Sequence, residues 1–341
     1  MRNPGLLSVF VVMFAVGWLS CAGTSAGTKP DAPAGKAPVR FIFDTDMDTD
    51  VDDIGSVAVL HALADAGEID ILATVSSSFL PESSLCLNAM NTYFGRPRLP
   101  VGQPKGEGAG ISRGTKYADI ISNEYPHALT ADAIPDAVDV YRKVLAEAPD
   151  NSVVIATVGY VTNLRDLLKS SPDEHSPLNG HDLVVKKVKE VSCMGGRIPR
   201  DKGSSESGNF RPDPDSTKYF FENWPTQVMF SGDEIGERIM TGERVRKELP
   251  ENHPTRRAYD AYLGEKPERP SWDQAAVLYG ARGLGHYWTA HHQGHNAIIE
   301  HGNNEWRNEP DNKNHSYLVE KMDPEKVADI IEDLMVRAGQ K

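Results

Sequence analysis

The chain is poor in cysteine and in aromatic residues. Its 341 residues include three cysteines, and phenylalanine, tryptophan and tyrosine together make up 8% of the sequence. It has no CxxC pair and no Cys/His spacing typical of zinc, which excludes a structural zinc module. Cys86 and Cys193 either form one disulfide or remain two buried free thiols.

Positive charge is also scarce. Lysine and arginine number 36 against 49 aspartates and glutamates, which gives a net charge of −13. Because nucleic-acid binding depends on cations that neutralise phosphates, we expect no nucleic-acid partner. The hydrophobic content of 39% still suffices for a sizeable core, and the length is compatible with one α/β domain.

An apolar run spans residues 6–19 and is too short for a comfortable membrane span. It follows one arginine and precedes small residues, so residues 1–21 are predicted to be a secretory signal peptide, which implies a periplasmic or extracellular location. Cys21 stands where bacterial lipoproteins are cleaved, whereas Trp18 departs from the usual aliphatic residue, so a lipid anchor at Cys21 stays open. Small residues and proline predict a flexible linker over residues 22–38.

From residue 39 onward, buried-strand patterns alternate with helical patterns. This alternation predicts a single Rossmann-like α/β domain over residues 39–341, with an open, mostly parallel sheet covered by helices on both faces. The expected strands lie at residues 39–44, 69–78, 152–159, 185–196 and 226–232. Residues 295–302 and 315–321 would form a late hairpin or two edge strands. Residues 103–133 and 240–270 lack periodicity and are predicted to be loops or lids.

Six aspartates fall within ten positions where the first strand meets the first helix. They are Asp44, Asp46, Asp48, Asp50, Asp52 and Asp53, in the stretch DTDMDTDVDD. A helix N-terminus offsets only about 1 kcal/mol per carboxylate, and each unpaired neighbour raises the pKa of the next. A hard divalent cation such as Ca²⁺, which accepts about six to eight oxygen ligands, would relieve this repulsion.

Other acidic motifs fit this stretch less well. An EF-hand loop needs glycine at its sixth position and glutamate at its twelfth, and counting from Asp46 these places hold Val51 and Val57. A haloacid-dehalogenase-type phosphatase accounts for the first two aspartates, but Asp48 occupies the place of its threonine or valine. A simple acidic helix cap explains one or two aspartates and not six.

The stretch resembles the signature of the inosine–uridine preferring nucleoside hydrolase family, a strand followed by D-x-D-x-x-x-D-D and a helix. If Asp44 and Asp46 begin the match, it is two residues longer than the family pattern, and the extra loop carries Asp48 and Asp50. A second register begins at Asp46 and keeps the family's spacing. Both registers stay open at this point.

Two strand ends in the middle of the chain also resemble the family. TVSSS places Ser78 where family members carry a polar residue that contacts ribose, although a serine-rich turn explains it as well. ATVGYVTNL resembles the family's GPLTN segment, in which a threonine carbonyl binds calcium. That carbonyl would be the one of Thr162; alternatively, Thr162 and Asn163 only cap the next helix.

Later segments continue the resemblance. SCMGG matches the family's MGG, which would lay Met194 against the ribose. ESGNFRPDPDS aligns Asn209 with a ribose-binding amide and puts Glu206 one place from a usual acidic partner. PSWDQAAVLYG places Asp273 as the last calcium ligand. Trp272 stands where many members have a histidine acid, and where a purine-preferring branch has a tryptophan that stacks on the base.

The resemblance implies calcium-dependent hydrolysis of the N-glycosidic bond of ribonucleosides, with a suspected purine preference. Asp46 would take a proton from the attacking water, and Asp52 and Asn209 would bind ribose hydroxyls. The calcium ligands would be Asp46, Asp53, the Thr162 carbonyl and Asp273. The alternatives are an exported calcium-dependent nucleoside- or sugar-binding protein without catalysis and, after it, a phosphatase.

Several assignments stay open. Without a histidine before Asp273, the leaving base would be assisted by stacking on Trp272 or protonated by a histidine of the C-terminal region. Asp48 and Asp50 have no assigned role. The sequence is also compatible with a homo-oligomer.

Overall fold

The computed structural model describes residues 1, 37–105, 116–198, 208–299, 302–309 and 314–339. The predicted signal peptide, Cys21, Glu206 and nearly all of the predicted linker lie outside these residues. Within the described ranges, none of the helices combines the length and the apolar character that crossing a membrane requires.

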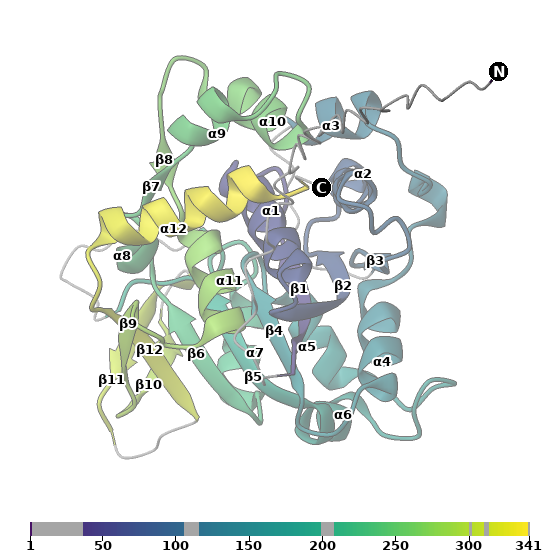
Figure 1. Cartoon of the computed structure of the whole chain (residues 1–341). Helices are drawn as coiled ribbons and strands as arrows, with labels where there is room; N and C mark the ends of the chain where they lie inside the picture. The colour runs from purple at the N-terminus through teal and green to yellow at the C-terminus, as the bar shows by residue number, and fades with distance from the viewer. Residues whose placement is uncertain (2–36, 106–115, 199–207, 300–301, 310–313, 340–341) are drawn as a thin grey trace. The chain divides into compact units, whose positions relative to one another are not determined.

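An eight-stranded sheet forms the centre of the domain (Figure 1). Its strands are β1 (Val39–Thr45), β2 (Ile69–Ser76), β3 (Val101–Gly102), β4 (Val153–Thr157), β5 (Val188–Met194), β6 (Gln227–Ser231), β9 (Trp288–His291) and β12 (His315–Glu320). The order is β3-β2-β1-β4-β5-β6-β12-β9, and only the pairing of β9 with β12 is antiparallel among the described strands of this sheet. The predicted open, mostly parallel sheet is confirmed. The strand order reverses between β1 and β4, where such sheets bind ligands beyond their carboxyl ends.

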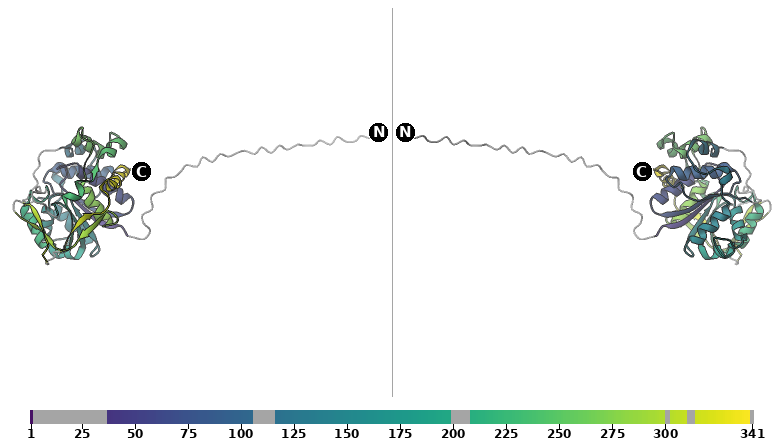
Figure 2. Two further views of the ribbon diagram at one scale, coloured as in Figure 1. Left: turned by 90° about the vertical axis from the view of Figure 1, so that its left-hand side faces the viewer. Right: turned by 90° about the vertical axis from the view of Figure 1, so that its right-hand side faces the viewer.

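Helices cover both faces of the sheet (Figure 2). Strand β1 alternates its side chains, so Phe41 and Phe43 join one apolar cluster and Ile42 joins the other. The first cluster contains residues of α1 (Asp52–Asp65), α2 (Pro81–Tyr93), α3 (Ala118–Glu124), α10 (Pro254–Leu263), α11 (Trp272–Arg282) and α12 (Pro324–Arg337). The second contains residues of α4 (Ala137–Glu147), α5 (Thr162–Lys169), α6 (Gly180–Lys187) and α7 (Pro214–Asn223).

The two cysteines of the domain are buried free thiols on opposite faces of the sheet. Cys86 belongs to the first cluster and Cys193 to the second. Burial raises the pKa of both thiols, which keeps them protonated and unreactive. Of the two alternatives left by the sequence, the free-thiol one is correct.

Two segments differ from the loops that the sequence predicts. Residues 240–270 contain β7 (Met240–Thr241), α9 (Glu243–Glu248), α10 and β8 (Arg269–Pro270), and the β7–β8 pair is antiparallel. Residues 103–133 contain α3 and the 3₁₀ turn η1 (Ala131–Ala133). The helices are short and their polar faces are wide, so buried anchors such as Val245, Tyr259 and Leu263 give no clear periodic signal.

The late strands also differ from expectation. β10 (His295–Ile298) pairs with β11 (Asn304–Arg307) in a separate two-stranded sheet and not with β12. β12 lies inside the main sheet, between β6 and β9, so it is not an edge strand. The hydrophobic pattern of a strand does not specify its partner, which here is the parallel strand β6 brought in by the tertiary fold.

Arg142 of α4 binds the loop between α5 and α6, and its substitution would test how much this contact stabilises the fold. Its side chain is 2% exposed and donates to Asp173 and to the carbonyls of Ser176 and Leu178. Arg142→Met would leave these acceptors without their donor, so we expect the free energy of unfolding to fall by about 2–4 kcal/mol in urea titrations. Lys143→Met is the matched control, since Lys143 is exposed on the same helix. An equal loss in both variants would contradict this role of Arg142.

Candidate active site

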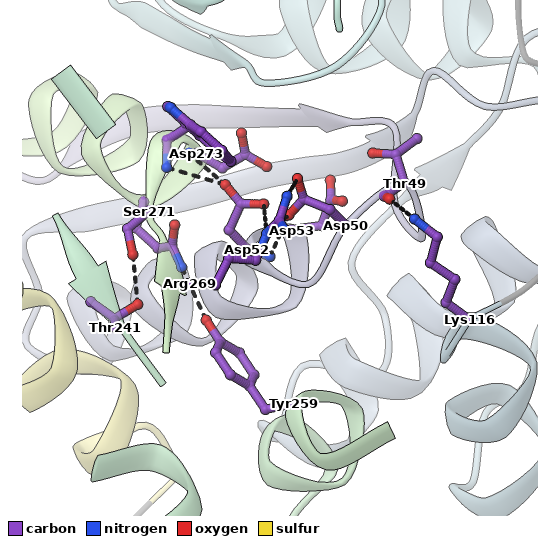
Figure 3. Close-up of polar contacts among 12 residues, drawn as sticks. Thr49, Asp50, Asp52, Asp53, Lys116, Thr241, Tyr259, Arg269, Ser271 and Asp273 are labelled. Carbon is purple, nitrogen blue, oxygen red and sulfur yellow. Dashed lines mark hydrogen bonds and ion pairs between the residues drawn. The ribbon is translucent and has the colours of Figure 1, made fainter. Parts of the chain in front are cut away.

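The acidic loop connects β1 to α1 at the carboxyl end of the sheet, and most of its carboxylates are buried. Figure 3 shows Asp50, Asp52 and Asp53 facing Asp273 and Arg269, which belong to a distant part of the chain. Folding therefore gathers here the first and the last segment of the predicted motif.

Asp44 and Asp48 are engaged by the surrounding fold. Asp44 accepts hydrogen bonds from the Tyr141 hydroxyl at 2.8 Å and from the Asn163 amide at 3.1 Å, and burial raises its pKa to about 7. Asp48 has a positive φ of 90°. Its Oδ1 accepts from the backbone N–H of Tyr117 at 2.8 Å and of Ala118 at 2.9 Å. Because Asp48 holds the 116–118 loop, the geometry favours the longer register, in which Asp48 lies in the extra loop.

Asp50 and Asp52 join the acidic loop to the segment before α11. Asp50 forms an ion pair with Arg269, whose Nε lies 2.8 Å from Asp50 Oδ1. Asp52 Oδ2 accepts from the backbone N–H of Trp272 at 3.1 Å and of Asp273 at 3.2 Å. Asp52 thus satisfies donors at the first turn of α11, and its predicted ribose contact would fall to Oδ1.

The remaining carboxylates, Asp46, Asp53 and Asp273, form no ion pair within the described ranges. Asp53 accepts from the Thr45 hydroxyl, and Asp46 accepts from Thr49 and Tyr160. Burial and repulsion from neighbouring aspartates raise the pKa of all three, that of Asp46 to about 7. These are the three carboxylates that the sequence predicts as calcium ligands.

The donor set suits a hard cation, since it is made of buried carboxylate oxygens that form no ion pair within the described part of the chain. Within the described residues, no three His, Cys, Asp or Glu side chains already converge closely enough to hold a metal ion. An ion at this place would therefore have to draw the repelling carboxylates together. The backbone around Asp46 is tightly packed, because a Cβ atom added at Gly159 would lie 2.3 Å from the amide nitrogen of Asp46.

The structure places the other predicted residues at strand ends and helix starts. Thr162 is the first residue of α5 and donates its hydroxyl to Asp213 at 2.7 Å; its carbonyl, the predicted metal contact, lies in the first turn of that helix. Ser78 lies in the turn after β2, and its hydroxyl accepts from Leu80 N at 3.2 Å. The hydroxyl can still donate, so its predicted ribose contact stays a prediction.

Asn209 and Met194, which are both predicted to contact the ribose, lie next to each other. Asn209 Nδ2 donates to the carbonyl of Val158 at 2.8 Å and lies 3.1 Å from Met194 Sδ. The amide thereby connects the chain beyond β4 with the end of β5. Its oxygen remains as the group for the predicted ribose contact.

A family profile and solved structures match this arrangement. The profile described as inosine-uridine preferring nucleoside hydrolase matches residues 41–329. The chain belongs to this family. It is accordingly a hydrolase that acts on N-glycosyl compounds, with small-molecule nucleosides as substrates. No curated protein matches the chain by sequence.

The fold agrees with solved nucleoside hydrolases. A plant nucleoside hydrolase superposes with a TM-score of 0.67 at 17% identity, covering 88% of this chain and 99% of the other. The purine-preferring ribonucleoside hydrolase from Gardnerella vaginalis gives 0.68 at 13% identity, with 89% and 100% covered. The type III effector XopQ, solved with adenosine diphosphate ribose, gives 0.67 at 13% identity, with 89% and 95% covered.

In this nucleoside hydrolase, contacts with neighbouring residues hold the indole ring of Trp272 in place. Its indole Nε1 donates to the carbonyl of Asp233 at 2.9 Å, and a Cβ on Gly236 would lie 2.6 Å from its Cδ1. The guanidinium carbon of Arg269 lies over the ring, 5.3 Å from its centroid. Arg269 therefore covers one face of the Trp272 ring, and only the other face is left for stacking.

Two histidines of the C-terminal region lie in the main sheet, away from the acidic loop. His291 and His315 belong to β9 and β12, and three strands separate β12 from β1. At a strand spacing of about 4.8 Å this offset is roughly 19 Å. His301 lies outside the described residues.

Sequence patterns missed the residues that surround the acidic loop. Arg269, Tyr262 and Lys116 come from segments predicted as loops, and Lys116 donates to the carbonyl of Thr49 (Figure 3). The loop aspartates Asp48 and Asp50 had no assigned partner. The excess of carboxylates predicts positive charge at this place, but it predicts a divalent cation and does not indicate these basic side chains.

Proposed function

We propose that this nucleoside hydrolase depends on calcium, prefers purine ribonucleosides and acts after export. The observation that supports calcium is the group of Asp46, Asp53 and Asp273, which are buried, repel one another and form no ion pair within the described ranges; burial and repulsion raise the pKa of Asp273, and the charge of Arg269 offsets this rise only in part. The leader pattern of residues 1–21 supports export. A lipid anchor at Cys21 and a homo-oligomer remain compatible with the sequence.

Calcium would be held by the three carboxylates and the Thr162 carbonyl, and when bound it would orient a water and lower the pKa of that water. Asp46 accepts the proton as the water oxygen approaches C1′. The surrounding carboxylates favour the positive charge that develops on the ribose. Asp52 Oδ1 and Asn209 Oδ1 are the acceptors left to bind ribose hydroxyls.

The purine preference rests on Trp272. The Gardnerella vaginalis relative is named for a purine preference, and the indole of Trp272 directly precedes the metal-binding Asp273. Stacking on an aromatic ring contributes about 1–3 kcal/mol per base and favours the larger purine surface.

Trp272→Ala should lower kcat/KM for inosine by about 10- to 100-fold and for uridine by less. Steady-state kinetics with both nucleosides measure the ratio. Trp224→Ala is a control, since Trp224 directly follows α7 and is buried in the second apolar cluster. An unchanged inosine-to-uridine ratio in Trp272→Ala would remove stacking from the proposal.

A reducing-sugar assay on the chain from residue 38 tests the function itself. Inosine, adenosine, guanosine, uridine and cytidine are offered with calcium and then with excess EDTA. Ribose release that stops with EDTA supports the proposal. Calcium-induced stabilisation without release from any nucleoside would instead support the non-catalytic nucleoside- or sugar-binding alternative. Release of phosphate from phosphorylated substrates would point to a phosphatase.

A further inference from the structure

Arg269 brings a positive charge into the acidic site. Its Nε donates to Asp50 Oδ1 at 2.8 Å, a second nitrogen contacts Asp50 Oδ2, and its Nε lies 4.0 Å from Asp52 Oδ1. In the longer register Asp50 lies in the part of the loop that exceeds the family's spacing, so this ion pair would depend on that extra length. The charge of Asp50 is thereby offset without the use of a metal ion.

Two aromatic rings fix the guanidinium in place. Its carbon lies 5.0 Å from the centroid of Tyr262 and 5.3 Å from that of Trp272. Stacking and a two-point contact with a carboxylate restrict an arginine far more than a surface ion pair does. The Arg269 side chain remains 23% exposed, so it is accessible to a ligand.

We propose that Arg269 contacts the leaving base and stabilises the negative charge that develops on it. This role rests on the proposed nucleoside hydrolase function. Ribose bound at Asp52 Oδ1, which lies 4.0 Å from Arg269 Nε, would place a base beside the guanidinium that covers one face of Trp272. Arg269 would then do what the histidine does in members that have one before the last aspartate.

The chemistry needs no proton from the protein. The bond between C1′ and the base nitrogen breaks, and its electron pair passes into the purine ring. The water oxygen bonds to C1′, and the proton of the water goes to Asp46. Arg269 stays charged and only donates hydrogen bonds, so it stabilises the anionic base until that base takes a proton from solvent.

A donor of this kind also selects among purines. Hypoxanthine and guanine present two acceptors, O6 and N7, on one edge, whereas adenine presents N7 beside an amino donor. An arginine can pair with both acceptors of the 6-oxopurines. We therefore expect inosine and guanosine to be better substrates than adenosine.

The test compares two ribosides in the full chain with calcium. Inosine needs help to release its base, while 4-nitrophenyl β-D-riboside releases a stable anion unaided. The variant Arg269→Met combined with Asp50→Asn removes both charges and so leaves no buried charge unpaired. We expect kcat/KM to fall by about 10²-fold or more for inosine and by less than about 5-fold for the nitrophenyl riboside.

Two further variants complete the design. Arg269→Lys keeps the charge but loses the planar fork, so it should give an intermediate loss for inosine. Arg257→Met is the matched control, because Arg257 of α10 forms a comparable fork with Glu124, at 2.8 and 2.9 Å, on the surface. Its kinetics should equal those of the unaltered chain.

The outcomes separate the two levels of the proposal. An equal loss for both ribosides in the double variant, or no loss for inosine, would overturn the role of Arg269 and leave the hydrolase function standing. Failure of the unaltered chain to hydrolyse either riboside would overturn the proposed function itself.

Discussion

Asp46→Asn should lower kcat/KM for nucleosides by about 10³-fold, since a positioned general base contributes about 10²- to 10⁴-fold. The substitution keeps the shape of the side chain but removes the group that accepts the proton of the water. It also removes one of the three carboxylates that form no ion pair within the described ranges. Initial rates of ribose release at saturating calcium measure the effect.

Asp48→Asn is the matched control for this experiment. Asp48 lies two residues away in the same loop, but its carboxylate accepts the backbone N–H groups of Lys116, Tyr117 and Ala118. We expect this variant to lose stability and to keep its activity when folded. If Asp48→Asn were the more damaging change at equal folding, the shorter register of the motif and Asp48 as the base would be the better assignment.

Calcium should stabilise the protein, and its effect should grow with pH. In the metal-free protein, burial and mutual repulsion raise the pKa of Asp46 to about 7, against 3.8 in its ordinary state, and raise those of Asp53 and Asp273 as well. The folded state then binds more protons than the unfolded chain between about pH 4 and pH 7. The free energy of unfolding in EDTA therefore falls as the pH rises through this window.

Bound calcium favours the ionised carboxylates and reverses this loss. At a free concentration of 100 times Kd, the stabilisation amounts to about 2.7 kcal/mol, and the rise in Tm should be larger at about pH 8 than at about pH 5. Asp273→Asn should reduce both the rise in Tm and its pH dependence. Thermal unfolding with calcium and with EDTA across this range measures both.

Glu234→Gln distinguishes the cluster from other buried acids. Burial raises the pKa of Glu234 to about 7, yet this residue of α8 (Asp233–Gly236) contacts Ile198 N and not the acidic loop. Glu234→Gln should change the pH dependence of Tm by the same amount with calcium and with EDTA. A calcium effect that stays constant with pH would contradict the assignment of Asp46, Asp53 and Asp273 as the ligands.

Local sequence patterns were sufficient to predict the central sheet of this protein and the helices that cover it. The apolar run of β1, the helical pattern of α1 and the repeated alternation predicted a parallel sheet with two covered faces, because such runs have few other ways to be buried. The patterns failed where packing chooses the partner: β12 pairs with β6, and short helices fill residues 240–270.

The candidate site divides in the same way. Sequence by itself determined that the acidic loop and the Trp272–Asp273 pair belong together, since residue types and spacing are local properties that match a family motif. Only the tertiary structure decided which aspartates are neutralised. The N–H groups of the 116–118 loop reach Asp48, and Arg269 reaches Asp50 from 219 positions away. No local pattern encodes such long-range donors, so the three unpaired carboxylates emerge only after folding.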